Sequence, residues 1–252
     1  MTRPSVLVTG GAKRLGKAMV ERFAQGGWHT VIHCNTSRDA ADDLAATLPS
    51  AEVVQCNLSD PEAGAAMVRQ LAERLSDWRC LVNSASIFAV DEVTALDPET
   101  NRKAMQVNAA APALLAQTYL AHAKSGAGRR VIQFTDQKLR NLNPDFFSYT
   151  MSKAAASIAS QMLAMAHDGK DRIYTLAPGA ILPSHDQSEA EAERSHTMNL
   201  LQRRTGADEI AEAALFLAEG PLASGQSIYV DSGQHLLNQP RDVIYMEREG
   251  RA

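Results

Sequence analysis

A tyrosine and a lysine with the spacing needed for proton transfer stand four positions apart, Tyr149 and Lys153. Residues four apart share one face of a helix, so the two side chains can cooperate. A lysine cation near a phenol favours the phenolate and lowers the pKa of the tyrosine toward the working range, which makes it a usable acid or base. A packed phenol beside a surface lysine is the plainer alternative.

A glycine-rich run, TGGAKRLG at residues 9–16, predicts a dinucleotide site. Glycines let the backbone turn sharply and approach a pyrophosphate at a helix N-terminus. Arg14 stands where the usual pattern has its middle glycine, and a guanidinium can pair with phosphate or extend over the cofactor to a substrate. An ordinary connection between a strand and a helix is the alternative. The cofactor residues expected here are Gly10, Lys13, Arg14 and Leu15.

The segment after the second predicted strand bears on the choice of cofactor. An acidic residue there would hold the ribose 2′-hydroxyl of NAD, but residues 34–38 contain no carboxylate. Ser37 and Arg38 are instead available for a 2′-phosphate, together with Lys13. We therefore expect NADPH/NADP as the cofactor. The alternative is that Arg38 is a solvated residue at the start of the next helix, near Asp39.

The elements that must position these residues alternate along the chain. Short β-branched runs predict seven strands, at residues 5–8, 30–33, 52–56, 80–83, 130–134, 173–177 and 227–230. Apolar residues at i, i+3 and i+4 predict helices that include 16–24, 39–48, 61–75, 152–165 and 208–217. This alternation predicts an α/β fold, a single Rossmann-type doubly wound parallel sheet with helices on both faces. We expect one domain, 1–252, with a polar lid at about 183–205 and a tail at about 236–252.

Composition narrows the classes of partner. The chain has 25 basic and 29 acidic residues, a net charge of -4, which gives no basic face for nucleic acid. No apolar run reaches the roughly 18 residues that span a bilayer. The positions of Cys34, Cys56 and Cys80 indicate buried, reduced thiols. His29 and His33 lie too far apart on a strand to share a metal. We expect a cytoplasmic protein that binds small molecules, with no nucleic-acid, membrane or metal partner.

Several motifs together resemble the short-chain dehydrogenase/reductase family over nearly the whole chain. They are residues 9–16, Asn83-Ser84-Ala85-Ser86, Asn108, Tyr149 with Lys153, Pro178-Gly179 and Asp231-Ser232-Gly233. The resemblance implies hydride transfer from nicotinamide, Tyr149 as proton donor, Lys153 on the nicotinamide ribose, and a homotetramer. It further implies cofactor contacts at Asn83, Ala85, Pro178, Gly179 and Leu58, and at Asn57, which replaces the usual adenine-facing aspartate.

Asn108 also has a physical argument of its own. Pro112 lacks the N–H that would bond the carbonyl four residues earlier in a helix, and that carbonyl belongs to Asn108. A freed carbonyl can hold a water that feeds protons through Lys153, which is the role the family gives this asparagine. The alternative is that the sequence marks only a helix kink, and both interpretations can hold.

Asp136 departs from the family, most of whose members have a serine thirteen residues before the tyrosine. A carboxylate repels a developing alkoxide, so it suits a nitrogen heterocycle better than a ketone or an alcohol. With Arg14, Ser86 and Phe88, this position resembles the pteridine reductases and the bacterial dihydromonapterin reductases. That resemblance implies substrate contacts at Arg14, Ser86, Phe88, Asp136 and Tyr149, with Phe88 stacked on the pterin. Core packing of Phe88, and an Arg14 that binds cofactor alone, are the alternatives.

The sequence therefore predicts NADPH-dependent reduction of a pterin, whether a 7,8-dihydropterin, dihydromonapterin or dihydrofolate. Hydride goes to carbon, and Tyr149 with Asp136 protonates nitrogen. A carbonyl or alcohol reductase that uses Thr135 for the missing hydroxyl is a second possibility, because strand ends tolerate slips of one residue. A nucleotide-sensing module without catalysis is a third, suggested by Asp136 and Asn57.

Overall fold

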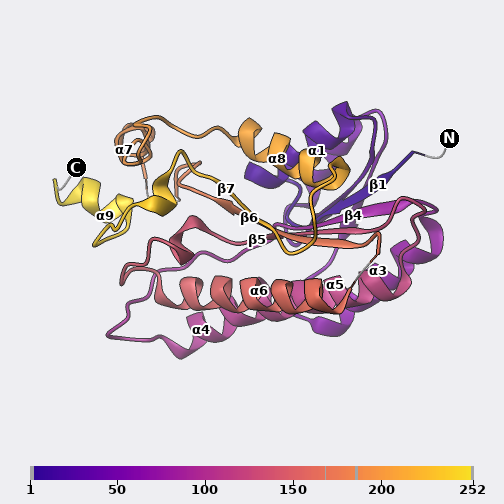
Figure 1. Cartoon of the computed structure of the whole chain (residues 1–252), viewed down its shortest axis with the longest axis horizontal. Helices are drawn as coiled ribbons and strands as arrows, with labels where there is room; N and C mark the ends of the chain where they lie inside the picture. The colour runs from indigo at the N-terminus through magenta and orange to yellow at the C-terminus, as the bar shows by residue number, and fades with distance from the viewer. Residues whose placement is uncertain (1–2, 168, 185–186, 251–252) are drawn as a thin grey trace.

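Seven parallel strands form one sheet in the order β3-β2-β1-β4-β5-β6-β7 (Figure 1). The computed structural model describes residues 3–167, 169–184 and 187–250. Its strands are β1 (Ser5–Val8), β2 (His29–Cys34), β3 (Ala51–Gln55), β4 (Trp78–Asn83), β5 (Arg130–Phe134), β6 (Arg172–Pro178) and β7 (Ser227–Val230). The strand order reverses between β1 and β4, so the predicted doubly wound sheet is confirmed.

Burial explains why the strand sequences differ across the sheet. Every residue of β1 and β5 is buried, as expected of central parallel strands covered on both faces. The edge strands β3 and β7 are only partly buried. The structure starts β2 at His29 and β4 at Trp78, slightly before the predicted ranges, and the other strand bounds differ from the prediction by at most one residue.

Helices cover both faces of the sheet (Figure 1). One face packs against α1 (Arg14–Gln25), α2 (Arg38–Ala46) and α8 (Ala207–Glu219), and the other against α3 (Pro61–Arg74), α5 (Ala111–His122) and α6 (Phe147–Ala166). Helix α4 (Pro98–Met105) packs along α6, and a π-helical turn, Gln106–Ala110, joins it to α5. This turn immediately precedes the segment that contains Pro112, so the helix is interrupted where the sequence predicts a kink.

The predicted lid and tail both contain helices. The lid region holds α7 (Glu189–Ser195), and the tail holds α9 (Val243–Arg248), which packs on α7 (Figure 1). Two short 3₁₀ turns, Gln137–Leu139 and Gln234–Leu236, follow β5 and β7. Within the described ranges, no helix combines the length and apolarity needed to cross a membrane.

Candidate active site

A cavity of about 420 Å³ is bounded by the segments that follow β1, β4, β5 and β6. The lid and the tail complete its wall through Gln187, His196 and Asp242. Of the residues predicted to bind cofactor or substrate, those that line the cavity are Gly10, Lys13, Arg14, Leu15, Ala85, Ser86, Phe88, Asp136, Tyr149, Lys153, Pro178 and Gly179. These predicted residues come from five parts of the chain, and the structure gathers them into one site.

The remaining predicted residues do not line this cavity, namely Ser37, Arg38, Asn57, Leu58, Asn83 and Asn108. Asn83 is buried, and its amide donates to the Pro112 carbonyl at 3.1 Å, so its side chain ties β4 to α5. The Oδ1 atom of Asn57 accepts from the Ser59 N–H in a local turn. Arg38 is the first residue of α2, and its Nε donates to Asp42 at 2.7 Å.

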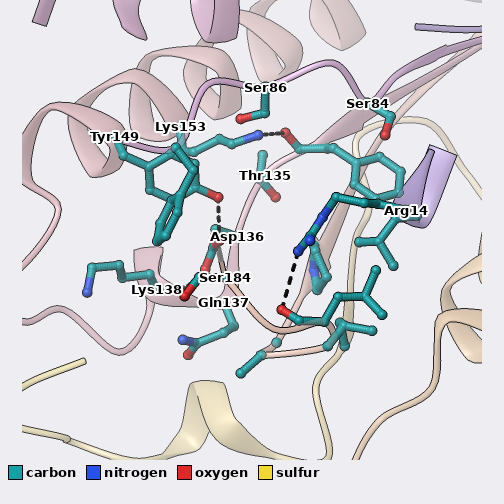
Figure 2. A pocket seen from close by; sticks show the side chains of 18 of the residues that line it. Arg14, Ser84, Ser86, Thr135, Asp136, Gln137, Lys138, Tyr149, Lys153 and Ser184 are labelled. Atoms are coloured by element: carbon teal, nitrogen blue, oxygen red, sulfur yellow. Dashed lines mark hydrogen bonds between the residues drawn. The ribbon is translucent and has the colours of Figure 1, made fainter. Parts of the chain in front are cut away.

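Tyr149 and Asp136 meet at the centre of the site (Figure 2). Asp136 follows β5, and its Oδ1 accepts from the Lys138 backbone N–H at 2.8 Å, which begins the 3₁₀ turn. Its Oδ2 accepts a hydrogen bond of 2.6 Å from the hydroxyl of Tyr149, in the first turn of α6. The carboxylate is therefore held in place through both oxygens.

The pKa of Tyr149 moves opposite to the sequence expectation. Burial raises its pKa well above the usual value, and the neighbouring charge of Asp136 and the hydrogen bond to it raise it further. Burial also raises the pKa of Asp136, against the hydrogen bond from Tyr149. The predicted lowering of this pKa is wrong, because burial and the adjacent carboxyl of Asp136 both disfavour the phenolate. Tyr149 stays protonated, as a proton donor must.

Lys153 is directed to the backbone. Its Nζ donates to the carbonyl oxygen of Phe134 at 3.0 Å and lies 5.5 Å from the ring centre of Tyr149 (Figure 2). Burial lowers the pKa of Lys153 to about 8, opposed by the charge of Asp136.

Asn108, also buried, accepts from the Ile87 N–H at 2.7 Å and donates to Ser152 Oγ at 3.0 Å. The Asn108 side chain therefore links α6 to the segment that follows β4. That its backbone carbonyl holds a water stays a prediction.

The glycine-rich loop has the shape that a pyrophosphate needs. A Cβ on Gly16 would lie 2.1 Å from the carbonyl oxygen of Gly10, and Gly10 has φ +66°. The first turn of α1 has no acidic residue and no side-chain cap, so its N–H groups and the positive end of the helix dipole are available to an anion. Arg14 has φ 53°, a conformation that favours glycine.

His33 supports this loop, a role that the sequence did not reveal. The buried ring accepts from the Gly10 N–H through Nδ1 at 3.1 Å, and Nε2 lies 3.0 Å from the Cys56 carbonyl oxygen. Burial lowers the pKa of His33 to about 4, against the bond to Cys56. A neutral ring with its proton on Nε2 satisfies both partners. The only sequence signal was a histidine on a buried strand, which does not identify its partners.

Arg14 crosses from the loop to the start of the lid. Its guanidinium donates to the carbonyl oxygens of Pro183 at 2.9 Å and Leu182 at 3.4 Å (Figure 2). Ser86 lies on the cavity wall after β4. In the lid, His196 lines the cavity, whereas His185 lies outside the described residues.

Phe88 belongs to an aromatic cluster. Its ring stacks on Phe146 with centres 4.2 Å apart and meets the edge of Tyr149 at 4.8 Å, yet it is 41% exposed. Phe146, at φ 54°, also stacks on Tyr245 of α9. Phe88 is therefore not simply a core residue, and it lines the cavity.

The tail supplies site residues for which the sequence had no motif. Lys138 is buried beside the cavity, and its ammonium bonds Asn143 and, at 3.3 Å, Asp242 at the start of α9. Ile244 packs against Tyr149 and Phe146.

Thr135, the alternative hydroxyl, is buried and donates to the Leu176 carbonyl at 3.4 Å. Within the described residues, no group of three His, Cys, Asp or Glu side chains is arranged to hold a metal.

Known proteins and a family profile match this sequence over most of its length. A family profile described as enoyl-(acyl carrier protein) reductase matches residues 10–235. Dihydromonapterin reductase of Shigella boydii is 24% identical over 92% of this chain and 96% of that protein. The crystal structure of FolM alternative dihydrofolate reductase 1 from Brucella canis, complexed with NADP, is 37% identical with a TM-score of 0.88 and covers 96% of this chain and 97% of that chain. Angucycline C-6 ketoreductase LanV with bound NADP is 25% identical with a TM-score of 0.83, over 93% and 96%.

Proposed function

Because this chain belongs to the short-chain dehydrogenase/reductase family, we propose that it is an NADPH-dependent reductase of pterins. The substrate is a 7,8-dihydropterin, dihydromonapterin or dihydrofolate, and the product is its tetrahydro form. One observation carries the proposal: a carboxyl, Asp136, is hydrogen-bonded to the proton-donating Tyr149. Two matching proteins, a dihydromonapterin reductase and an alternative dihydrofolate reductase, support the same class of substrate.

The cofactor would be held by the glycine-rich loop and by residues around it. NADPH, when bound, supplies the hydride. Gly10, Leu15 and the first turn of α1 would face the pyrophosphate. Lys13, Ser37 and Arg38 would bind the 2′-phosphate. The other cofactor contacts we propose are Arg14, Asn57, Leu58, Asn83, Ala85, Tyr149, Lys153, Pro178 and Gly179.

Proton delivery follows from the electrostatics of the site. Reduction of a C=N bond adds hydride to carbon and a proton to nitrogen. Tyr149 gives that proton from its hydroxyl, since its raised pKa keeps the phenol protonated. Asp136, whose pKa is also raised, is the adjacent carboxyl that can return a proton to Tyr149. A ketone reductase would need the hydroxyl of Thr135, which is directed to a backbone carbonyl.

Steady-state assays with NADPH test the proposal. We expect turnover of at least one among dihydromonapterin, dihydrobiopterin and dihydrofolate. Tyr149→Phe should lower kcat by about 10²–10⁴-fold because the proton donor is lost. Tyr229→Phe removes a phenol outside the cavity and should not affect kcat. Reduction of ketones with no turnover of any pterin would contradict the proposal.

We also propose a homotetramer built from single-domain protomers in the cytoplasm. The outer face of α6 is apolar and open in the isolated chain, with Ile158 55%, Met162 65% and Met165 87% exposed. Covering such a face removes apolar area from water. Light scattering should give four times the protomer mass, and Met162→Glu should lower it. A monomer in solution would contradict the assembly, and two separate unfolding transitions would contradict the single domain.

A further inference from the structure

One charged pair in the cavity wall has no part in the proposed proton transfer: Lys138 with Asp242 of the tail. The Lys138 side chain is 3% exposed, whereas that of Asp242 is 16% exposed, so the carboxylate is the more accessible member of the pair. Figure 2 shows Lys138 on the opposite side of Asp136 from Arg14, which belongs to the glycine-rich loop. The pair therefore lies away from the loop that we propose to hold the cofactor.

The carboxylate of Asp242 is held in place and still has acceptor capacity. Its Oδ2 accepts from Lys138 Nζ at 3.3 Å, and its Oδ1 accepts from the Ile244 N–H at 3.2 Å. The Asp242 backbone N–H donates to Asp145 at 2.7 Å, and its carbonyl oxygen accepts from the Tyr245 N–H at 2.9 Å. Each carboxylate oxygen can accept two hydrogen bonds. Within the described residues each has one partner, so each can accept another from a ligand.

This carboxylate lies close to the proton donor. Ile244, two positions after Asp242, packs against Tyr149 and also lines the cavity. The charge of Asp242 adds to the effects of burial and of Asp136, which raise the pKa of Tyr149. Lys138, the partner of Asp242, follows Asp136 by two positions, and its backbone N–H bonds that carboxyl group. The tail therefore forms the cavity wall beside the phenol that gives the proton.

The chemistry of the substrate places a side chain near this wall. In a 7,8-dihydropterin, the C=N bond that is reduced joins a ring nitrogen to the carbon that bears the side chain of the pterin. When Tyr149 gives its proton to this nitrogen, the side chain therefore begins on the adjacent carbon. The glycine-rich loop, with Arg14, lies on the other side of Asp136 (Figure 2). The direction away from that loop leads along the tail, where Asp242 lines the cavity.

We propose that the carboxylate of Asp242 accepts hydrogen bonds from hydroxyl groups on the side chain of the pterin, and so selects substrates whose side chain is hydroxylated. In dihydromonapterin this side chain has three carbons with a hydroxyl on each. The inference rests on the proposed pterin reductase function and adds a specificity residue to it. A pterin without these hydroxyls forms no bond to the charged acceptor and binds less tightly.

One analogue and two substitutions test this contact. The analogue, 6-methyl-7,8-dihydropterin, has the same ring and no hydroxyl, and its KM on wild-type enzyme should be about tenfold or more above that of dihydromonapterin. Asp242→Ser keeps a residue that can cap α9 but withdraws the carboxylate. It should raise KM for dihydromonapterin about tenfold and leave KM for the methyl compound within about twofold. Asp242→Asn keeps one acceptor oxygen and should show a smaller rise.

The control is Asp97→Ser, the same change at the residue that caps α4, which does not line the cavity. Both KM values should stay unchanged in this variant. Equal KM values for the two pterins on wild-type enzyme, a result that needs no variant to fold, would overturn the contact. So would a rise in both KM values by the same factor in Asp242→Ser, since the carboxylate would then only hold the tail in place.

A failure of the proposed function can be told apart from a failure of this contact. If the wild type binds NADPH but reduces no pterin, the proposed function fails. The Kd values of the two pterins for the NADP complex then decide on Asp242. Tighter binding of dihydromonapterin that is lost in Asp242→Ser supports the contact, and equal or absent binding of the two pterins overturns it.

Discussion

The hydroxyl of Tyr149 donates a hydrogen bond of 2.6 Å to Oδ2 of Asp136. The two residues are thirteen positions apart, one after β5 and the other on the first turn of α6. A neutral hydroxyl at position 136 could polarise a substrate oxygen but could not store a proton. A buried carboxyl with a raised pKa can do so.

Asp136→Asn should therefore lower kcat by about 100-fold or more, because the amide keeps the size of the side chain but cannot deliver a proton. The Kd for NADPH should stay unchanged. Asp97→Asn, at the N-terminus of the exposed helix α4, is the matched control and should keep full activity. Stopped-flow measurement of hydride transfer provides the readout, and a kcat within twofold of wild type would remove Asp136 from the proton path.

Arg38→Ala should discriminate between the two nicotinamide cofactors. Loss of a charged donor to the 2′-phosphate should raise KM for NADPH about tenfold and leave KM for NADH unchanged. Asp42 holds the Arg38 guanidinium at 2.7 Å in the described structure, so Asp42→Ala should release it and not weaken NADPH binding. If Arg38→Ala affected NADPH and NADH equally, Arg38 would not be the residue that reads the phosphate.

Stability should fall in acid because of His33. Its pKa is about 4 when folded and 6.5 when unfolded, so between these values the unfolded chain binds a proton that the folded chain does not. The contribution is complete above pH 6.5 and is lost as the pH falls toward 4, by about 3 kcal/mol. Urea unfolding at pH 7 and pH 4.5 measures it. His33→Gln should flatten this part of the pH dependence; a slope equal to that of the wild type would contradict the assignment.

The pair formed by Lys138 and Asp242 should stabilise the tail. The Lys138 side chain is 3% exposed and that of Asp242 is 16% exposed. Lys138→Met should lower the free energy of unfolding by about 2 kcal/mol, since it leaves a carboxylate with little access to water. The double variant with Asp242→Asn should lose less than the sum of the two single losses. Arg102→Met, which breaks an exposed pair with Glu99, is the control and should cost under about 1 kcal/mol.

Local sequence patterns were enough to predict the strands of the sheet. Central strands such as β1 and β5 are short and rich in valine and isoleucine, as buried parallel strands are, and their bounds were predicted to the residue. The start of α6 was less predictable: its first residues, Phe147 and Ser148, follow Phe146, whose left-handed backbone has no glycine to mark it. In that conformation the Phe146 ring stacks on Phe88 and Tyr245, two residues from distant parts of the sequence.

By itself, the sequence determined the sheet, the glycine-rich loop and the identity of the Tyr149, Lys153 and Asp136 side chains, since each depends on residue type and short-range spacing. The tertiary structure alone decided the electrostatics. The pKa of Tyr149 rises because the phenol is buried and lies beside Asp136. His33 beneath the loop owes its role to Gly10, a neighbour 23 positions away in the sequence. Residue type sets which chemistry is available, and burial with long-range contacts sets which protonation state is used.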